Sequence, residues 1–239
     1  MRRKINKLTL VLSCGLLLFS CKKDEAPRSV ASLNVINVAT GAGPIKVNAS
    51  GNQVDWSNVT TTIAFGASSV YTIPEGNLSF NGATTGNPNA DLFNLSKTFK
   101  SGGLYTLFVV GETPNIETIF NEENYPSYPD SALAVRVVNA SPNSAAINVT
   151  LATSTTINEF SNLTYKQQSE FKKYSAKPGV TNAAFNFQIR NMAGVILASY
   201  PFTATNLSQA RFKGVTLVFR GLVGGTGINV PLVSFVPNY

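Results

Sequence analysis

The chain contains no histidine and only two cysteines among its 239 residues. Without histidine it lacks the commonest general base and metal ligand, which excludes Ser-His and Cys-His catalytic arrangements. Both cysteines, Cys14 and Cys21, lie in the N-terminal segment, so no disulfide is available to the rest of the chain. We therefore expect no metal site, no cofactor and no catalytic centre, and a fold stabilised by apolar burial.

Acidic residues are also few, twelve in all. Glycoside hydrolysis needs two carboxyl groups about 5–10 Å apart across the scissile bond. Candidates such as Asp55, Glu75 and Asp91 are scattered over turn-rich segments, where a solvated surface position is expected. The sequence therefore predicts a protein that is not an enzyme, and a carboxylate-dependent glycoside hydrolase is the least favoured alternative.

Long apolar runs are absent except near the N-terminus, where Leu8 to Phe19 are almost all apolar. Twelve residues are too few to cross a bilayer, which takes roughly 20. Basic residues precede the run, as in a secretory signal peptide. Leu18-Phe19-Ser20-Cys21 is typical of a bacterial lipobox. We expect residues 1–20 to be a cleaved signal peptide and the Cys21 sulfur to carry a fatty acid such as palmitate.

Cys14 offers a second reading, because Val11-Leu12-Ser13-Cys14 has a similar pattern. Polar residues directly after Cys21 favour Cys21 as the processing site. The segment Lys22-Lys23-Asp24-Glu25 resembles the tag that directs lipoproteins of the Bacteroidota type to the outer face of the outer membrane. Residues 21–30 would then be a tether at the cell surface. An anchor facing the periplasm is the alternative.

Charge is divided unevenly along the chain. Removing residues 1–20 takes away four basic residues and lowers the net charge from +7 to +3. Residues 31–126 carry a net charge of −4 and residues 131–239 one of +7. Opposite signs could either favour docking of the two halves on each other or orient the protein near a charged surface. An exported, anchored protein of this charge does not suggest a nucleic-acid partner.

The sequence repeats itself at a spacing of about 100 residues. Leu33–Val38 matches Val135–Ala140, and Pro44–Val47 matches Ala146–Val149, both at an offset of 102. Such a period indicates two copies of a whole domain. We assign the first copy to residues 31–120, a Pro-containing linker to residues 121–131, and the second copy to residues 132–239.

Nearly every segment of both copies has the composition of a strand. Short runs rich in Val, Ile, Thr, Phe and Tyr alternate with clusters of Gly, Asn, Ser and Pro. Leu133, Val135 and Val137 share one face of a period-2 pattern, with Arg136 on the opposite face. The pattern predicts an all-β protein of two tandem immunoglobulin-like antiparallel β-sandwich domains with little helix.

The segment Arg136-Val137-Val138-Asn139-Ala140-Ser141-Pro142 resembles the opening strand and turn of domain-of-unknown-function family 4397. The first copy lacks the Ser-Pro pair. The resemblance implies exported bacterial proteins built of tandem sandwich-like repeats, often lipid-anchored, with no established activity and so no functional residues to transfer. Asn139 and its counterpart Asn37 end a strand, where a short amide bonds neighbouring backbone. We expect both to be structural.

Candidate ligand contacts are aromatic. Trp56 is the lone tryptophan and follows a polar loop, so it is either a core residue or a binding residue. Tyr125 and Tyr128 lie in the linker, where they could line a cleft between the domains. The predicted function is a binding, adhesion or scaffold module, with a surface glycan or an envelope protein as partner. The alternative is a glycan-binding accessory protein.

Two further features lie in the second half. Lys166, Lys172, Lys173 and Lys177 form a basic cluster, which either contacts anionic glycans or lipid headgroups or protects a strand edge from aggregation. Asp130-Ser131-Ala132 resembles an acceptor for O-glycosylation in envelope proteins of the Bacteroidota type, which makes Ser131 a candidate modification site.

Overall fold

The computed structural model describes residues 29–52 and 55–238. The predicted signal peptide, Cys14, Cys21 and most of the tether lie outside these residues. Within the described part, no helix is long and apolar enough to cross a membrane.

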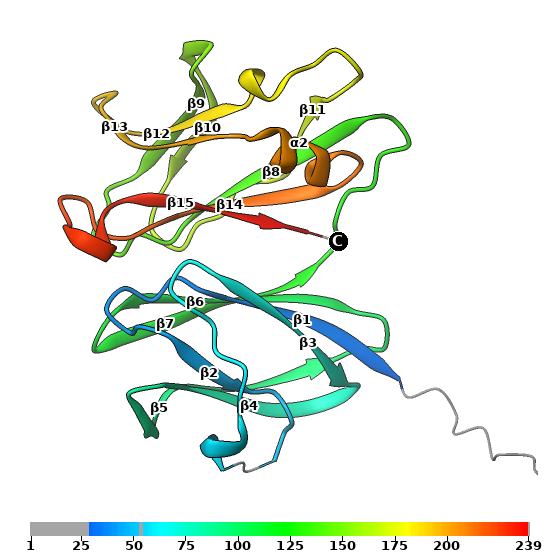
Figure 1. The fold of residues 1–239 in the computed structure, drawn as a ribbon, viewed down its shortest axis with the longest axis vertical. Coiled ribbons are helices and arrows are strands. Elements are labelled where there is room, and N and C mark those ends of the chain that lie inside the picture. The colour runs from blue at the N-terminus through cyan, green and yellow to red at the C-terminus, as the bar shows by residue number, and fades with distance from the viewer. Residues whose placement is uncertain (1–28, 53–54, 239) are drawn as a thin grey trace, which may run out of the picture.

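Strands β1 to β7 build the first half of the molecule as two facing sheets (Figure 1). One sheet has the order β3-β1-β6-β7 and the other the order β2-β4-β5. A short 3-10 helix, η1 (Trp56–Asn58), lies between β2 and β3. The strands are β1 (Val30–Asn37), β2 (Ile45–Asn48), β3 (Ser68–Pro74), β4 (Gly76–Thr84), β5 (Asn87–Phe99), β6 (Leu104–Glu112) and β7 (Asn115–Glu123).

Strands β8 to β15 build the second half with the same plan. Sheet β11-β8-β14-β15 corresponds to β3-β1-β6-β7, and sheet β10-β9-β12-β13 corresponds to β2-β4-β5 with one more strand. The strands are β8 (Ala132–Asn139), β9 (Ile147–Leu151), β10 (Ser154–Leu163), β11 (Lys172–Ser175), β12 (Asn186–Asn191), β13 (Ile196–Pro201), β14 (Gly214–Arg220) and β15 (Leu232–Pro237). Helices η2 (Asn182–Ala184), α2 (Ala204–Ala210) and η3 (Gly227–Asn229) lie in connections.

The sandwich architecture predicted from the sequence is confirmed, and the two sandwiches stack into four layers of sheet (Figure 1). Three apolar layers alternate with the sheets. Two are the cores of the individual sandwiches. The third lies between the sandwiches and is shared by β1 and β6 on one side and β8, β14 and β15 on the other. Its buried residues are Ile36, Val38, Phe108, Val110, Val138, Ala140, Val218 and Val236.

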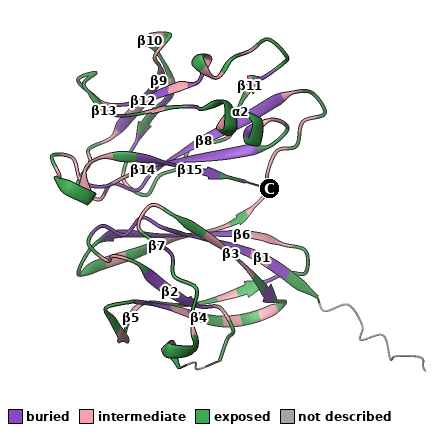
Figure 2. Cartoon of the chain, viewed as in Figure 1, coloured by how far each residue is buried: buried purple, intermediate pink, exposed green. Residues whose placement is uncertain are grey.

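The central strands of the stack are consequently buried on both faces (Figure 2). Every residue of β8 is buried, including Arg136, whose exposed fraction is 5%. Arg136 does lie on the face opposite Leu133, Val135 and Val137, as the period-2 pattern predicts. That face, however, meets the first sandwich and not solvent.

Strand order departs from the immunoglobulin plan in two ways. The first two strands lie in opposite sheets, whereas they are neighbours in an immunoglobulin constant domain. In addition, β1 pairs in parallel with β6, and β8 pairs in parallel with β14. The remaining strand pairs are antiparallel in the described residues. A parallel pair suits strands that are covered on both faces.

The predicted linker begins too early. Strand β7 continues to Glu123, so the connection between the sandwiches is residues 124–131. The predicted linker thus included three polar residues of β7, Asn121, Glu122 and Glu123. Two of these polar side chains are used in the contact between the sandwiches, where Asn121 bonds Gln168 and Glu123 bonds Arg136.

The two strand-ending asparagines are structural, as expected. The Asn37 amide donates to the carbonyl oxygen of Ile63, and the Asn139 amide donates in the same way to that of Leu163. Each side-chain oxygen also accepts from a backbone N–H two residues later. Both residues are fully buried, so each amide ties the end of a central strand to the same distant segment of its sandwich.

Candidate functional site

A polar hollow of about 380 Å³ opens on the first sandwich beside Trp56. Strands β2, β4 and β5 form its wall, and the loop that carries η1 closes one side. Trp56 is partly exposed and does not belong to the core of the sandwich, which decides against the core reading of this residue. The other lining residues are Asn48, Gly51, Asn52, Ser79, Phe80, Asn81, Asp91 and Asn94.

Local backbone chemistry places Trp56. Gly51 has φ of +78°, a left-handed conformation that favours glycine, and it lies close to the Leu78 side chain of β4. Asp55 caps η1, because its carboxylate accepts from the Ser57 backbone N–H at 2.9 Å. This hydrogen bond holds the pKa of Asp55 below its ordinary value. Lys46 Nζ donates to the Trp56 carbonyl oxygen at 2.8 Å.

A chain of hydrogen bonds orders the polar side chains of the hollow. Asn48 Nδ2 donates to the Asn52 carbonyl oxygen at 2.7 Å and to Asn81 Oδ1 at 3.2 Å. Asn81 Nδ2 in turn donates to Asp91 Oδ1 at 2.9 Å. The result is a fixed set of amide groups with one carboxylate, which offers both donors and acceptors to a polar ligand.

The second sandwich is built differently at the same place. There, the segment after β9 forms strand β10, and Leu163 pairs with Ile147 at its end. In the first sandwich the equivalent contact is a single bridge between Ile63 and Ile45. The described residues before it, 49–52 and 55–62, form no strand. An irregular loop with a tryptophan therefore replaces a regular edge strand, and such loops commonly carry function.

Comparison with known families places the chain in one of them. The family described as Domain of unknown function (DUF4397) matches residues 31–150, half of the chain. This chain belongs to that family. The match covers the first sandwich, the linker, β8 and most of β9, and it confirms the resemblance predicted from residues 136–142.

Comparisons of this DUF4397 protein with curated sequences and with solved structures give no information on its ligand. No curated protein sequence matches it. One solved structure, described as alpha-glucan recognition by family 41 carbohydrate-binding modules from streptococcal virulence factors, aligns over 85% of this chain and 96% of its own. The identity is 11% and the TM-score 0.25. A similarity of this size says nothing about ligands.

Tyr125 and Tyr128 of the DUF4397 protein do not join Trp56 in one aromatic platform. The Tyr125 hydroxyl lies 2.9 Å from Thr106 Oγ1, and its ring meets that of Phe171 edge-on at 6.1 Å. Tyr128 lies beneath Lys173, whose Nζ is 4.7 Å from the ring centroid. Both tyrosines thus pack in and beside the contact between the sandwiches, whereas Trp56 lies beside the outer sheet of the first one.

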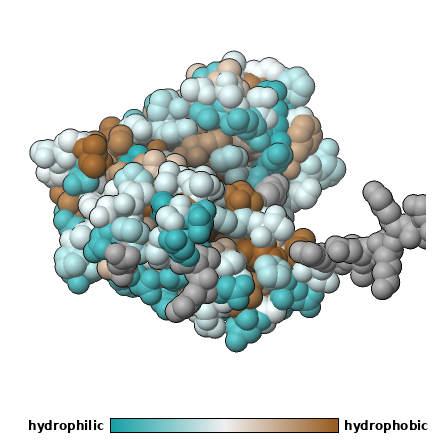
Figure 3. Space-filling model, turned by 60° about the horizontal axis from the view of Figure 1, so that its bottom comes forward, coloured by the Kyte–Doolittle hydropathy of each residue, from teal (hydrophilic) through white to brown (hydrophobic). Residues whose placement is uncertain are grey.

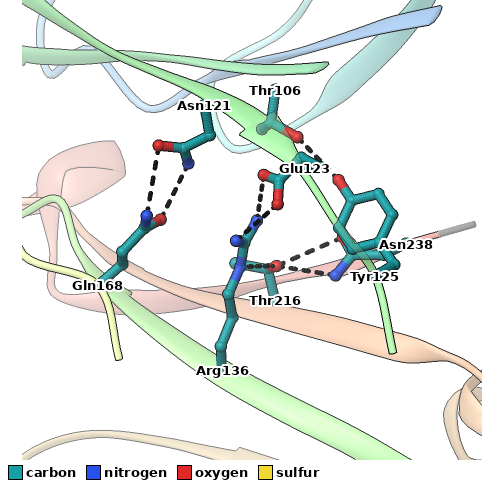
Figure 4. Close-up of polar contacts among 8 residues, drawn as sticks. All are labelled: Thr106, Asn121, Glu123, Tyr125, Arg136, Gln168, Thr216 and Asn238. Carbon is teal, nitrogen blue, oxygen red and sulfur yellow. Dashed lines mark hydrogen bonds and ion pairs between the residues drawn. The ribbon is translucent and has the colours of Figure 1, made fainter. Parts of the chain in front are cut away.

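A buried ion pair joins the sandwiches near Tyr125 (Figure 4). Arg136 donates from both terminal nitrogens to Glu123, at 2.6 and 2.8 Å, and its Nε donates to Thr216 Oγ1 at 2.9 Å. The exposed fractions of the two charged side chains are 6% and 3%. The guanidinium also lies 4.8 Å from the Phe171 ring centroid. This geometry fixes the orientation of one sandwich on the other and offers no open space to a ligand.

A second, smaller hollow of about 240 Å³ lies at the contact between the sandwiches, with Glu112 and Glu117 among its lining residues. Glu117 is engaged by Lys166 and by the Tyr165 hydroxyl. The hydrogen bond from Lys166 holds the pKa of Glu117 below its ordinary value. A carboxyl group in this state is a poor general acid. Among the described residues that line the hollow beside Trp56, Asp91 is the lone acidic one.

The predicted basic cluster is largely neutralised. Lys172 pairs with Glu159 at 2.7 Å and Lys173 with Asp130 at 3.2 Å, while Lys166 pairs with Glu117. Strand β11, which carries Lys172 and Lys173, is an edge strand of its sheet. These contacts support the reading of the lysines as protection of an edge and not as a site for anions.

Ser131 lies where the linker meets the second sandwich. Its carbonyl oxygen accepts from the Ala176 N–H at 2.8 Å, and the side chain of the preceding residue, Asp130, is held by Lys173. The residue is partly exposed. O-glycosylation of Ser131 stays a prediction.

Proposed function

We propose that this DUF4397 protein is a non-catalytic, lipid-anchored binding module of a bacterial outer membrane, displayed at the cell surface. The observation that carries the proposal is the ordered polar hollow beside Trp56 on a rigid body of two docked sandwiches. The hollow combines a tryptophan with polar side chains, which suits a surface ligand. Asp91 is the one carboxylate among its described lining residues, which does not suit general acid–base catalysis by a carboxyl pair.

The docked second sandwich supports the binding role through rigidity. A shared apolar layer and a buried ion pair hold the two halves together, so the second sandwich acts as a stiff scaffold for the first. Adhesion to an envelope protein through loops and sheet edges uses this same scaffold.

Glycan binding is the second candidate, and the hollow itself favours it. Tryptophan presents a broad apolar face to the C–H groups of a sugar ring. Amide side chains beside it can both donate to and accept from hydroxyl groups. An array of purified glycans probed with a soluble form lacking residues 1–28 tests this. We expect Trp56→Ala to abolish the signal and Tyr128→Ala, away from the hollow, to leave it unchanged. Equal signals from wild type and Trp56→Ala would exclude the hollow as the glycan site.

The anchor is tested in cells by metabolic labelling with a fatty acid. Wild type and Cys14→Ser should take up the label, and Cys21→Ser should not. Label that persists in Cys21→Ser but disappears in Cys14→Ser would move the processing site to Cys14. Protease added to intact cells should degrade the protein if it faces outward, and full protection would place it on the periplasmic side.

A further inference from the structure

We infer that the ligand surface continues beyond the hollow along the outer face of sheet β2-β4-β5, and that it takes several consecutive units of an uncharged polysaccharide. The inference rests on the proposed binding role of the Trp56 hollow. It adds the extent of the site and the chemical class of the ligand.

The outer face of this sheet is a ladder of polar, uncharged side chains. Alternate residues of β4 point away from the core, which places Asn77, Ser79 and Asn81 on the outer face while Phe80 is buried between them. Opposite them in the antiparallel register stand residues of the same kind. They are Thr98, Ser96 and Asn94 of β5.

These ladder residues are accessible. All are exposed except Asn81, which is partly exposed. Ser96 Oγ donates to Asn77 Oδ1 at 3.2 Å, a hydrogen bond between diagonal neighbours on the two strands. The face that Figure 3 brings forward, which includes this sheet, is mostly hydrophilic. A ligand on this face must therefore compete with water through matched hydrogen bonds and not through apolar burial alone.

Charge around the face argues for a neutral ligand. Asp91 is bonded to Asn81, and Asp55 is bonded to the backbone of η1. Lys46 donates to the Trp56 carbonyl oxygen. Lys46 is thus already engaged within the protein, and the Asp91 carboxylate would repel an anionic sugar at close range. Hydroxyl groups, in contrast, can donate to the carboxylate and bond the amides.

The length of the face argues for a ligand of several units. At about 3.3 Å per residue, Asn77 lies roughly 13 Å along β4 from Asn81, which lines the hollow. A ligand that contacts both must therefore be longer than one sugar unit. Trp56 stands beside one end of this ladder.

The second sandwich provides a natural contrast. Gln188 of β12 pairs with Thr150 of β9, as Asn81 of β4 pairs with Asn48 of β2. There, the Arg190 guanidinium bonds Gln188, Thr150 and the Gly194 carbonyl oxygen. The polar groups of that face are thus satisfied by a neighbouring cation. Gln188→Ala is accordingly the matched control for changes to the ladder.

The test is calorimetric titration of the full-length protein in detergent with a neutral glucan, a neutral galactomannan and the anionic polygalacturonate. Glucan and galactomannan oligosaccharides of two, four and six units are titrated in parallel. We expect binding of a neutral polymer, with the six-unit chain at least tenfold tighter than the two-unit chain. The double variant Asn77→Ala/Ser96→Ala should weaken six-unit binding about tenfold and leave two-unit binding and the thermal midpoint unchanged. Gln188→Ala should change neither.

Three results would overturn the inference. Binding that depends on Trp56 but is equal for short and long chains, and is insensitive to the ladder variant, would leave the proposed glycan site standing and confine it to the hollow. Preference for polygalacturonate would refute the neutral ligand. Absence of Trp56-dependent binding to every saccharide would refute the glycan site itself.

Discussion

The buried ion pair between the sandwiches supplies a quantitative test of their docking. Glu123→Ala leaves the Arg136 guanidinium buried with one neutral hydrogen-bond partner, Thr216, and two aromatic rings. Both charged side chains are nearly inaccessible to water. Solvent therefore can neither screen the pair nor rehydrate the arginine cheaply once its partner is gone.

Removing one member of a buried pair typically costs about 3–5 kcal/mol, because the remaining charge is uncompensated. For a chain of this size, each kcal/mol lowers the melting temperature by about 2–4 °C. We therefore expect Glu123→Ala to lower it by roughly 6–20 °C. Replacement of both partners by apolar residues, Glu123→Leu with Arg136→Met, should recover most of this loss, since no charge is then left buried.

Thermal and urea unfolding of Glu123→Leu, of Arg136→Met and of the variant that carries both measures the coupling energy of the pair as a double-mutant cycle. The control is Lys100→Ala, which breaks the Lys100–Glu122 pair, whose side chains are 70% and 54% exposed. That variant should melt like the wild type. If Glu123→Ala were as stable as Lys100→Ala, the ion pair would not hold the sandwiches together and the docking argument would fail.

Three other outcomes follow from particular contacts. Gly66→Ala should lower the melting temperature, because φ is +84° and a Cβ would come within 2.6 Å of the Arg220 guanidinium; an unchanged melt would contradict that packing. Asn139→Ala should cost about 1–3 kcal/mol in urea unfolding through unpaired buried backbone groups, and a neutral effect would contradict its structural role. Glu117, whose folded pKa is below its ordinary 4.5, stabilises the fold above that pH and ceases to do so as the pH falls through the folded value. Between pH 6 and pH 3, the melting temperature of Glu117→Gln should therefore fall less than that of the wild type. An equal fall in both proteins would contradict the contact between Glu117 and Lys166.

Much of the architecture could be predicted because the local sequence patterns match the strands that the fold contains. Period-2 alternation indicates the strands, and two strand-ending asparagines at an offset of 102 indicate the duplication. The two asparagines make matching bonds, each to an equivalent carbonyl oxygen of its own sandwich, 26 residues later in the first copy and 24 residues later in the second.

Docking of the sandwiches was only suggested by the opposite charges of the halves. The stronger signal is that apolar residues occupy both faces of the central strands, as in Val137-Val138 and in residues 107–110. A strand with apolar residues on both faces is covered on both faces. Arg136 argued against this conclusion, because a charged residue on the face opposite an apolar stripe ordinarily indicates that this face is exposed to solvent. Its partner, Glu123, comes from a segment that the sequence assigned to the linker.

The full set of residues in the candidate site could not be predicted from the sequence, because pairing between distant strands brings them together and no local pattern reveals that pairing. Trp56 was recognisable as a candidate by its type and its polar loop. Its neighbours Asn48, Asn81 and Asp91 lie on three different strands or their ends, and only the register of β2, β4 and β5 brings them together.

Docking itself decides which surfaces remain for partners. The inner sheets of both sandwiches are covered by each other, and edge strand β11 carries the paired lysines. The outer sheets are therefore the broad faces left to solvent. In the second sandwich Arg190 satisfies the polar groups of that face. In the first, Asn48 is buried and Asn81 is partly exposed, whereas the other polar residues of the ladder on β4 and β5 are exposed on the sheet that carries the hollow beside Trp56. Duplication has thus produced one face on which an arginine engages the polar groups and one on which most polar side chains face solvent.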